Sequence, residues 1–402
     1  MLDSDSLLPL YVQLLRTLQR RLDAGEWRPG DLLPSEAELG RTYNVSRITV
    51  ARAMSDLART GAVRRQRGTR PVVAAPAQPA AGAPALAFLT PGLEYDWLHR
   101  IYRGFEDAAA ANGGYALLTG PRGDDGTDLH HVRPLVTAGP VRGLAFCHAT
   151  IAPAERAFWD MLRTKQGIPF AFIGIYQPDF VADRVLADNV AAGAMATRHL
   201  LGLGHRRIAF LNPTRSHLQE GSACPGRIRG YRQALAEAGL DAGNHSSHGG
   251  WVLDEVLPAT LSDAEQRERL LEFFERGDIT AAVTCNDTLA VLVQHYLDTA
   301  GVRVPDDLAM VGISDERIAT LARAPVTTVR IEAGALGRTA AELLLARLAG
   351  DTSEPREVVI PVSLVIRASC GAAARGGAGE GVVYTVEDAM REAQTQLEQV
   401  TL

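Results

Sequence analysis

Residues 29–68 read PGDLLPSEAELGRTYNVSRITVARAMSDLARTGAVRRQRG, and this stretch decides the fold of the amino-terminal part. Ser35 is followed three residues later by Glu38, which is the spacing of a capping box. In that motif each side chain accepts a hydrogen bond from the backbone of the other residue, so the pair marks the first turn of a helix. The stretch therefore predicts a short helix that opens at Ser35 and reaches Tyr43.

A second helix follows after a turn of only two residues, 44–45. Ser46 has the residue type that caps a helix, and Gly61 has the type that ends one. The apolar side chains predicted to point inward from this helix are Ile48, Val50, Met54 and Leu57. Two short helices joined by so small a turn form a helix-turn-helix, in which the second helix presents its first residues to the major groove of DNA.

The flanking residues complete a small α+β domain. Leucines at positions 10, 14, 18 and 22 recur at helical spacing, which predicts a first amphipathic helix that ends at Gly25. After Gly61, residues 62–73 read as a strand, a glycine turn and a second strand, which is a wing. Together these pieces predict a winged helix-turn-helix domain over residues 1–73.

Positive charge is concentrated in this domain. The chain has a net charge of −6, but its first 70 residues hold twelve arginines against eight acidic residues, which leaves a net −10 for the rest. Lys165 is the only lysine, so nearly all positive charge is carried by guanidinium groups, which suit paired hydrogen bonds to phosphate or guanine. A short basic segment on an acidic body is typical of phosphate contact, because each neutralised phosphate releases counterions. The expected partner is double-stranded DNA.

Together with PLYVQLLRTLQRRLDAG at residues 9–25, this stretch resembles the winged helix-turn-helix of GntR-type transcriptional regulators. The resemblance implies that the start of the recognition helix and the tip of the wing contact operator DNA. The residues at these positions are Ser46, Arg47, Thr49 and Arg52 on the recognition helix, Arg67, Gly68 and Thr69 on the wing, and Ser35 and Glu36 at the start of the preceding helix. The alternative roles, helix capping for Ser35 and Glu36 and a surface ion pair for Arg47, stay open. Ala37 and Ala51 stand where relatives often carry a basic residue, so a relative's base specificity does not transfer.

The rest of the chain predicts a linker and a larger domain. Residues 74–84 hold three prolines and no large apolar side chain, which is typical of a semi-extended linker. Beyond it, apolar runs at 86–89, 115–118, 144–147, 170–175, 208–211, 281–285 and 309–313 alternate with helical patterns at 98–111, 189–202, 227–238, 265–276, 288–300 and 333–348. Such alternation predicts parallel sheets covered by helices on both faces, and about 280 residues exceed one ordinary sheet. Residues 85–370 are therefore expected to form a two-lobed α/β domain with a ligand cleft beyond the carboxyl ends of its strands.

Residues 86–370 resemble the periplasmic-binding-protein-like effector domain of lactose- and purine-repressor relatives, in stretches such as LADNVAAGAMATRHLLGLGHRRIAFLN and AAVTCNDTLAVLVQHYLDTAGVRVPDDLAMVGISD. A GntR-type head on such a body is the architecture of arabinose-repressor-like regulators. The hinge helix usual in lactose-repressor relatives is absent, and the linker replaces it. The resemblance implies a homodimer on a palindromic operator and a small polar effector, such as a sugar, that changes the placement of the two heads. Asp188 and Asn189 match a motif near the hinge.

The resemblance also implies effector contacts. The matching positions are Arg227, Trp251, Asn286, Asp287, Ser314 and Asp315, with Trp97, His148 and Tyr176 as weaker candidates in the first lobe. Arg227 matches an arginine that holds ligand oxygens, and Trp251 falls where an aromatic ring covers the ligand. Helix capping is the alternative for Asp287. Ser314 stands where relatives often carry an aspartate, which puts carboxylate recognition of ligand hydroxyls in doubt.

Several kinds of chemistry are not expected. The cysteines, Cys147, Cys224, Cys285 and Cys370, are far apart and form no CxxC motif, so neither a disulfide framework nor a metal site is predicted. No HExxH, GxSxG or GxxxxGK[ST] motif occurs, and no cofactor is expected. No apolar stretch of about 18 residues and no signal peptide are recognisable, so the chain is expected to be a soluble protein of the reducing cytoplasm without membrane contact.

The predicted function is a ligand-responsive transcriptional regulator, a repressor rather than an activator, and not an enzyme. Two alternatives stay open: a body similar to a pyridoxal-phosphate aminotransferase, and the same regulator sensing a nucleoside or another non-sugar metabolite. The first needs a lysine for its Schiff base, and Lys165, expected in a loop, is a poor candidate. Residues 371–402 begin with a glycine-rich run and are expected to form a flexible extension.

Overall fold

The computed structural model describes residues 10–23, 26–28, 30–59, 63–64, 70–73, 83–90, 96–120, 130–137, 139–147, 151, 153–213, 221–240, 251–253, 255–256, 262–372 and 383–385. The chain divides into two compact units, Met1–Ala81 and Gly82–Leu402, here called the head and the body.

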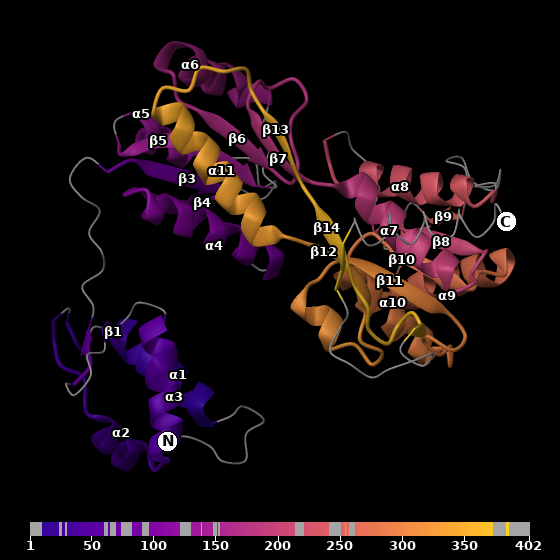
Figure 1. The fold of residues 1–402 in the computed structure, drawn as a ribbon, viewed down its shortest axis with the longest axis horizontal. Helices are drawn as coiled ribbons and strands as arrows, with labels where there is room; N and C mark the ends of the chain where they lie inside the picture. The colour runs from indigo at the N-terminus through magenta and orange to yellow at the C-terminus, as the bar shows by residue number, and fades with distance from the viewer. Residues whose placement is uncertain are drawn as a thin grey trace, which may run out of the picture. The chain divides into compact units, whose positions relative to one another are not determined.

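The described part of the head consists of three helices and a two-stranded antiparallel sheet (Figure 1). The elements are α1 (Leu10–Asp23), α2 (Glu36–Tyr43), α3 (Arg47–Arg59), β1 (Val63–Arg64) and β2 (Val72–Val73). Ser35 and Glu38 form the expected capping box at the start of α2. Asn44 ends α2 in the left-handed conformation, with φ at 52°, and so turns the chain into α3. The predicted helix-turn-helix fold is confirmed.

Ile48 is not part of the head's core, so its predicted inward position is wrong. The core is formed by Leu14, Leu18, Leu33, Leu39, Val50, Ala53, Met54, Leu57, Val63 and Val73, whereas the Ile48 residue is 82% exposed. Successive helical residues are rotated by about 100°, so Ile48 lies roughly 200° around the helix from Val50. Both side chains cannot face the same core.

The first lobe of the body is a six-stranded parallel sheet with the strand order β13-β7-β6-β5-β3-β4 (Figure 1). Its strands are β3 (Ala85–Leu89), β4 (Tyr115–Thr119), β5 (Val141–Cys147), β6 (Phe170–Ile173), β7 (Asp183–Ala187) and β13 (Glu357–Ile360), and its helices are α4 (Asp96–Ala111), α5 (Arg133–Thr137), α6 (Arg156–Gln166) and α11 (Ala333–Leu348). Leu86 and Phe88 of β3 pack in one core with α4 and α11, whereas Ala87 and Leu89 pack in another with residues of α5 and α6. The sheet is buried on both faces, which is why its central strands are apolar throughout.

The second lobe is a seven-stranded sheet in the order β15-β14-β12-β11-β10-β8-β9, in which β14 and β15 run antiparallel to their neighbours. Its strands are β8 (Ile208–Leu211), β9 (Val252–Leu253), β10 (Ala281–Thr284), β11 (Ala309–Ser314), β12 (Thr327–Ile331), β14 (Val362–Val365) and β15 (Val383–Thr385), and its helices are α7 (Asn189–Gly202), α8 (Cys224–Glu237), α9 (Asp263–Gly277) and α10 (Asp287–Thr299). Ile208 and Phe210 face a core with α7 and α8, and Ala209 and Leu211 face a core with α9 and α10. The predicted pair of mostly parallel α/β sheets is confirmed.

The chain passes between the lobes at Asp188, at Glu332 and at Pro361. Asp188 begins α7 by accepting a hydrogen bond from Ala191 N at 2.8 Å, and its own backbone N donates to Ile360 O at 3.0 Å. Two of the passages therefore touch. The strands nearest these passages, β7, β12, β13 and β14, were not predicted. Residues 383–385, in the predicted extension, form β15 beside β14.

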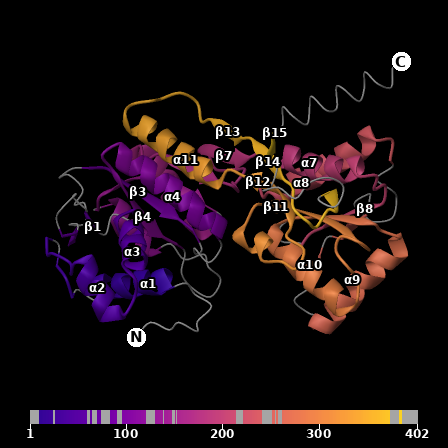
Figure 2. The same cartoon turned by 60° about the horizontal axis from the view of Figure 1, so that its bottom comes forward.

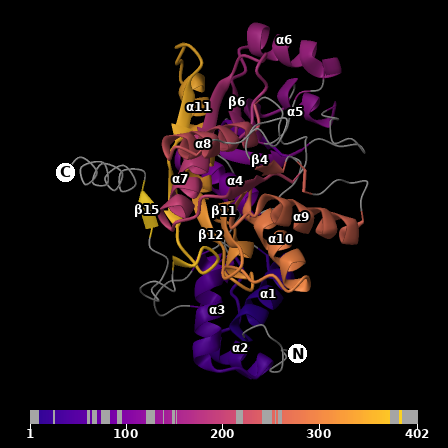
Figure 3. The ribbon, with the colours of Figure 1, turned by 90° about the vertical axis from the view of Figure 1, so that its right-hand side faces the viewer.

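Helices α7 and α8 lie side by side, as Figures 2 and 3 both show. Glycines make this close approach possible. A Cβ atom at Gly193 of α7 would overlap the carbonyl oxygen of Arg227 on α8, and one at Gly230 of α8 would overlap the carbonyl oxygen of Val190. The α7–α8 contact therefore fixes the backbone of Arg227. Among the described residues, no helix has the length and apolar character needed to cross a membrane.

Candidate functional site

The first turn of α3 presents an arginine to solvent. Ser46 Oγ accepts a hydrogen bond from Thr49 N at 3.2 Å, and the two hydroxyls lie 2.8 Å apart, so both serve the start of the helix. The Arg47 side chain is 87% exposed, and its Nε lies 3.9 Å from Glu36 Oε2. Such an exposed pair contributes little to stability, so Arg47 remains free to contact a ligand. Ile48, which follows it and was predicted to point inward, adds an exposed apolar side chain.

Arg52 and Ser35 have structural partners inside the head. The Arg52 guanidinium lies over the ring of Tyr11 on α1, 4.0 Å from its centroid. Ser35 N donates to Glu38 Oε2 at 2.7 Å, and Glu38 also accepts from Arg70, which follows the wing tip. Hydrogen bonding with the side chain of Ser35, with its backbone and with Arg70, in that order of size, lowers the pKa of Glu38 to about 2. The wing-tip candidates Arg67, Gly68 and Thr69 lie outside the described residues.

In the body, polar side chains gather where β10 and β11 end. Asn286 Oδ1 caps α10 by accepting from Leu289 N at 2.8 Å. Asp287 is 0% exposed, and its carboxylate accepts from Thr328 Oγ1 at 2.6 Å and from Glu316 N at 2.8 Å. A Cβ at Gly312 would overlap this carboxylate, so the glycine in β11 is what leaves room for it. The buried Asp287 therefore ties β11 and β12 to α10 and does not offer its oxygens to a ligand.

Asp315 is likewise occupied. Its two carboxylate oxygens accept from Arg330 Nε at 2.7 Å and from Arg367 Nη2 at 2.6 Å. Burial opposes ionisation, but these two guanidinium groups outweigh it and lower the pKa of Asp315. The Asp315 carbonyl oxygen accepts from Arg100 Nη2 of α4 at 3.0 Å, which is a contact between the lobes. Ser314, buried at the end of β11, precedes it with φ at 130°.

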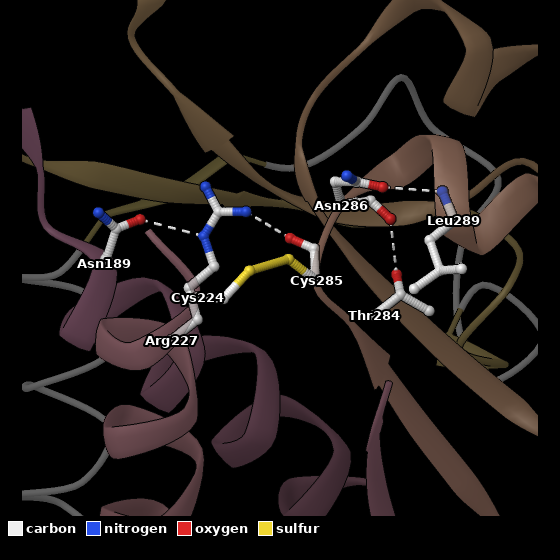
Figure 4. The surroundings of a disulfide bond; sticks show 7 residues. All are labelled: Asn189, Cys224, Arg227, Thr284, Cys285, Asn286 and Leu289. Carbon is white, nitrogen blue, oxygen red and sulfur yellow. Dashed lines mark hydrogen bonds between the residues drawn. A yellow bond between two sulfur atoms is a disulfide. The ribbon is translucent and has the colours of Figure 1, made fainter. Parts of the chain in front are cut away.

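Arg227 is the buried cation of this edge, 7% exposed (Figure 4). Its Nε donates to Asn189 Oδ1 at 3.0 Å, and its Nη1 donates to the carbonyl oxygen of Cys285. Burial lowers the pKa of Arg227 to about 10, an effect that nearby Asp287 and Glu316 oppose. The guanidinium group therefore stays charged at neutral pH, bonded to the residue that precedes Asn286.

A disulfide bond joins Cys224 to Cys285, which corrects the prediction that the cysteines form none (Figure 4). The two residues are 61 positions apart in the sequence, but Cys224 begins α8 and Cys285 follows β10, and their Cα atoms lie 6.4 Å apart. Sequence spacing gave no sign of this, because the approach depends on how α8 packs on the sheet. Cys147 and Cys370 are free and buried.

Trp251 does not lie at the strand-end edge. Trp251 precedes Val252, which pairs with Phe210 of β8, and Phe210 in turn pairs with Val283 of β10. The backbone of Trp251 is therefore level with the middle of β10. Its half-buried ring packs against the core under α9, where a Cβ at Gly277 would come within 2.9 Å of it. Gly277 ends α9 just before β10 begins, whereas Asn286 follows the other end of β10, so the ring is directed away from Asn286. The structure therefore does not bring Trp251 together with Arg227 and Asn286.

The weaker candidates of the first lobe have different surroundings. Tyr176 follows β6, its ring is covered by the Arg184 guanidinium at 4.1 Å, and its backbone N donates to Gly221 O at 3.1 Å, just before α8. Trp97 is half-buried against the core between β3 and α4. His148 lies outside the described residues. Tyr176 is thus the first-lobe candidate that the structure brings toward Arg227.

One hollow in the described residues lies away from this edge. A shallow hollow between α9 and α10 is lined by residues such as Arg267, His295 and Thr299, two or more turns along α10 from Asp287. In the part of the chain that the structure describes, no group of three or more His, Cys, Asp or Glu residues is placed to hold a metal ion.

The burial of Asp287 has a consequence for stability. Burial raises the pKa of Asp287 from 3.8 to about 7, so the folded state prefers the neutral acid and folding takes up a proton. The contribution of Asp287 to the free energy of unfolding of the body should therefore fall as the pH rises from about 4 to about 7. Urea denaturation of the wild type and of Asp287→Asn at several pH values should show this fall as a pH-dependent difference between the two chains. An identical pH dependence in the variant would contradict the assignment.

Two family models match the chain. The model for bacterial regulatory proteins of the gntR family matches residues 10–73, and that for a periplasmic binding protein-like domain matches residues 197–370. The chain joins a gntR-family head to a periplasmic binding protein-like body.

Known transcriptional regulators are similar to this chain. The arabinose metabolism transcriptional repressor of Geobacillus stearothermophilus is 27% identical over 346 residues, 84% of this chain and 91% of the relative. The transcriptional regulator CelR of Thermobifida fusca is 32% identical over 209 residues, 51% of this chain, and the match spans only 57% of CelR. The crystal structure of a LacI family transcriptional regulator from Enterococcus faecium with bound ribose has a TM-score of 0.58 at 24% identity, and the match covers 71% of this chain and 98% of that one. At that identity the likeness shows the fold alone. The named relatives are transcriptional regulators.

Proposed function

We propose that this protein is a DNA-binding transcriptional repressor whose affinity for its operator is set by a small polar effector such as a sugar. Residues 1–73 read the operator, residues 74–84 link the two units, and residues 85–370 bind the effector and form a homodimer. The relatives support this function, because they are transcriptional regulators and one of them aligns over 84% of this chain. We also propose a cytoplasmic location, where the DNA is.

The strongest support for this function is the pair of exposed side chains in the first turn of α3. Arg47 and Ile48 are both exposed in the first turn of a helix that Val50, Met54 and Leu57 anchor to the head's core. An arginine can make paired hydrogen bonds with guanine, and an apolar side chain can contact the methyl group of thymine. The pair therefore offers contacts that distinguish bases, in addition to the phosphate attraction of the basic head.

Selection from a pool of random double-stranded DNA tests this function. The full chain should enrich duplexes that share an inverted repeat, because a dimer with two heads reads two half-sites. Recovery of sequences with no shared motif would mean that the head binds only through phosphates and would contradict the proposal.

For the effector we propose direct contacts from Arg227, Asn286, Ser314 and Tyr176. Arg227 supplies a charged donor bonded to Asn189 and to the carbonyl of Cys285, and such a donor suits the hydroxyl or carboxylate oxygens of a small polar molecule. Asp287 and Asp315 are positioning residues, because other side chains and backbone groups already occupy their carboxylates. We leave Trp251 and Trp97 out of the contact set.

Thermal unfolding with a panel of L-arabinose, D-ribose, cellobiose and adenosine should identify the effector class. A ligand that binds only the folded body raises its melting temperature, by an amount that grows with concentration. The shift should disappear in Arg227→Lys, which keeps the charge but loses the planar pair of donors, and persist in Trp251→Phe. A shift that survives in Arg227→Lys would place the ligand elsewhere, and a shift with adenosine alone would favour a nucleoside.

The aminotransferase-like alternative is not favoured by the surroundings of its lysine. Lys165 lies in the last turn of α6 and is exposed, not in the loop that the sequence predicted. A Schiff-base lysine needs an enclosed site that lowers its pKa and orients its cofactor. Lys165 has no such enclosure.

A further inference from the structure

We propose that Cys224 and Cys285 form a reversible dithiol–disulfide modification site that determines how firmly the effector-binding residues are held. The proposal rests on the proposed function for the role of those residues, whereas the chemistry of the pair stands without it. In the cytoplasm, the location proposed above, a disulfide is usually transient and serves redox sensing or catalysis.

The pair joins two elements that carry proposed effector contacts. Cys224 is the first residue of α8, and Arg227 follows it one turn later. Cys285 follows β10, donates its backbone N to Leu211 O at 2.8 Å, and precedes the Asn286 cap of α10. The Cys285 carbonyl also accepts from Arg227. The sulfur bridge therefore ties the turn that carries Arg227 to the junction that carries Asn286 (Figure 4).

The other two cysteines are not equivalent. Cys147 lies at the end of β5 in the first lobe, and burial raises the pKa of its thiol, which makes it a poor nucleophile. Cys370 Sγ lies 3.3 Å from His199 Nε2 and 3.1 Å from Thr327 Oγ1. Each is buried and free, so they provide matched controls.

The reaction needs an oxidant, and we propose a low-molecular-weight disulfide, RSSR, such as oxidised glutathione. One cysteine thiolate attacks RSSR, forms a mixed disulfide and releases RS⁻. The second cysteine attacks the protein sulfur of the mixed disulfide and releases the second RS⁻. The two thiol protons pass through solvent to give two RSH, so the pair loses two electrons and RSSR gains them. Excess RSH reverses both steps.

The two states should differ in local mobility. Cys224 and Cys285 are each 2% exposed, so reaction with RSSR requires the first turn of α8 to open. In the oxidised chain the bridge restrains that opening. In the reduced chain, the hydrogen bonds of Arg227 to Asn189 and Cys285 and the packing of α8 on α7 still hold this turn. Oxidation should therefore slow amide exchange there and raise the melting temperature of the body, by an amount on the order of 5 °C.

The test uses the full chain equilibrated with oxidised glutathione or with dithiothreitol. Peptide mapping without reduction should find Cys224 linked to Cys285 in the first sample and both thiols free in the second. Hydrogen exchange should be slower in the oxidised sample over residues 224–227 and 285–289. Cys147→Ser and Cys370→Ser should keep this difference, whereas Cys224→Ser and Cys285→Ser should remove it.

Two results would overturn the inference. The pair could stay reduced with oxidised glutathione, or the two forms of the wild-type chain could exchange at the same rate over both segments. Both readouts use the unaltered chain, so they hold even where a serine variant fails to fold. Neither involves DNA or effector, so a failure of DNA binding would refute the proposed function and leave the redox pair unaffected.

Discussion

Replacing Arg47 with alanine is expected to weaken binding of the selected operator about tenfold or more, while non-specific DNA binding falls much less. The side chain is 87% exposed at the start of α3, and one good paired contact of arginine with a base is worth about 1–3 kcal/mol. Fluorescence anisotropy of a labelled operator duplex, compared with a scrambled duplex of equal length, measures both affinities.

Arg303→Ala is the matched control for this substitution. Arg303 is an exposed arginine of the body that pairs with Asp307 at 2.9 Å, so its loss removes the same charge without touching the head. The operator affinity of Arg303→Ala should match that of the wild type.

Ile48→Ala should also lower operator affinity without loss of stability, because the residue is outside the head's core. Equal loss of specific and non-specific binding in Arg47→Ala would indicate that Arg47 contacts only phosphates.

Replacing Gly193 with alanine is expected to destabilise the body by roughly 1–3 kcal/mol or more, the usual cost of forcing an extra carbon into a packed contact. The added Cβ would overlap the carbonyl oxygen of Arg227, so α7 and α8 must separate. Because that separation moves Arg227, effector binding should weaken as well. Thermal unfolding and urea denaturation measure the first effect, and the effector-induced rise in melting temperature measures the second.

Gly202→Ala provides a control in the same helix. A Cβ at Gly202 meets nothing within 4 Å, so this change should leave the body as stable or add up to about 1 kcal/mol, from the better helix propensity of alanine. If the two alanine variants unfold alike, the close approach of α7 and α8 is not what holds Arg227.

The parts of this structure that could be predicted from the sequence depend on local signals. The capping box of Ser35 and Glu38 and the cap of α3 by Ser46 involve residues three apart, so the helix-turn-helix was predictable. The apolar central strands were predictable for a similar reason, since a strand buried on both faces is apolar throughout. Strands with polar residues, such as β7 with Asp183 and Arg184, gave no such signal.

The candidate site was predictable only in part, because its geometry depends on distant segments. Asn286 could be placed at a strand end, but the burial of Asp287 depends on Thr328 and Gly312. Trp251 was misplaced because the register of β9 on β8 decides which way it points. For Ile48 a signal did exist: it is four residues from Arg52, on the face opposite Val50, so stricter helical counting would have found its exposure.

The most direct test of the proposed function is an anisotropy titration of the full chain with its selected operator, with and without each member of the sugar panel. We predict saturable binding that a scrambled duplex does not compete away, and a change in dissociation constant of about fivefold or more with at least one sugar, the usual range of allosteric coupling. Binding that is equal for operator and scrambled duplex would contradict the claim that the head of this chain reads a DNA sequence.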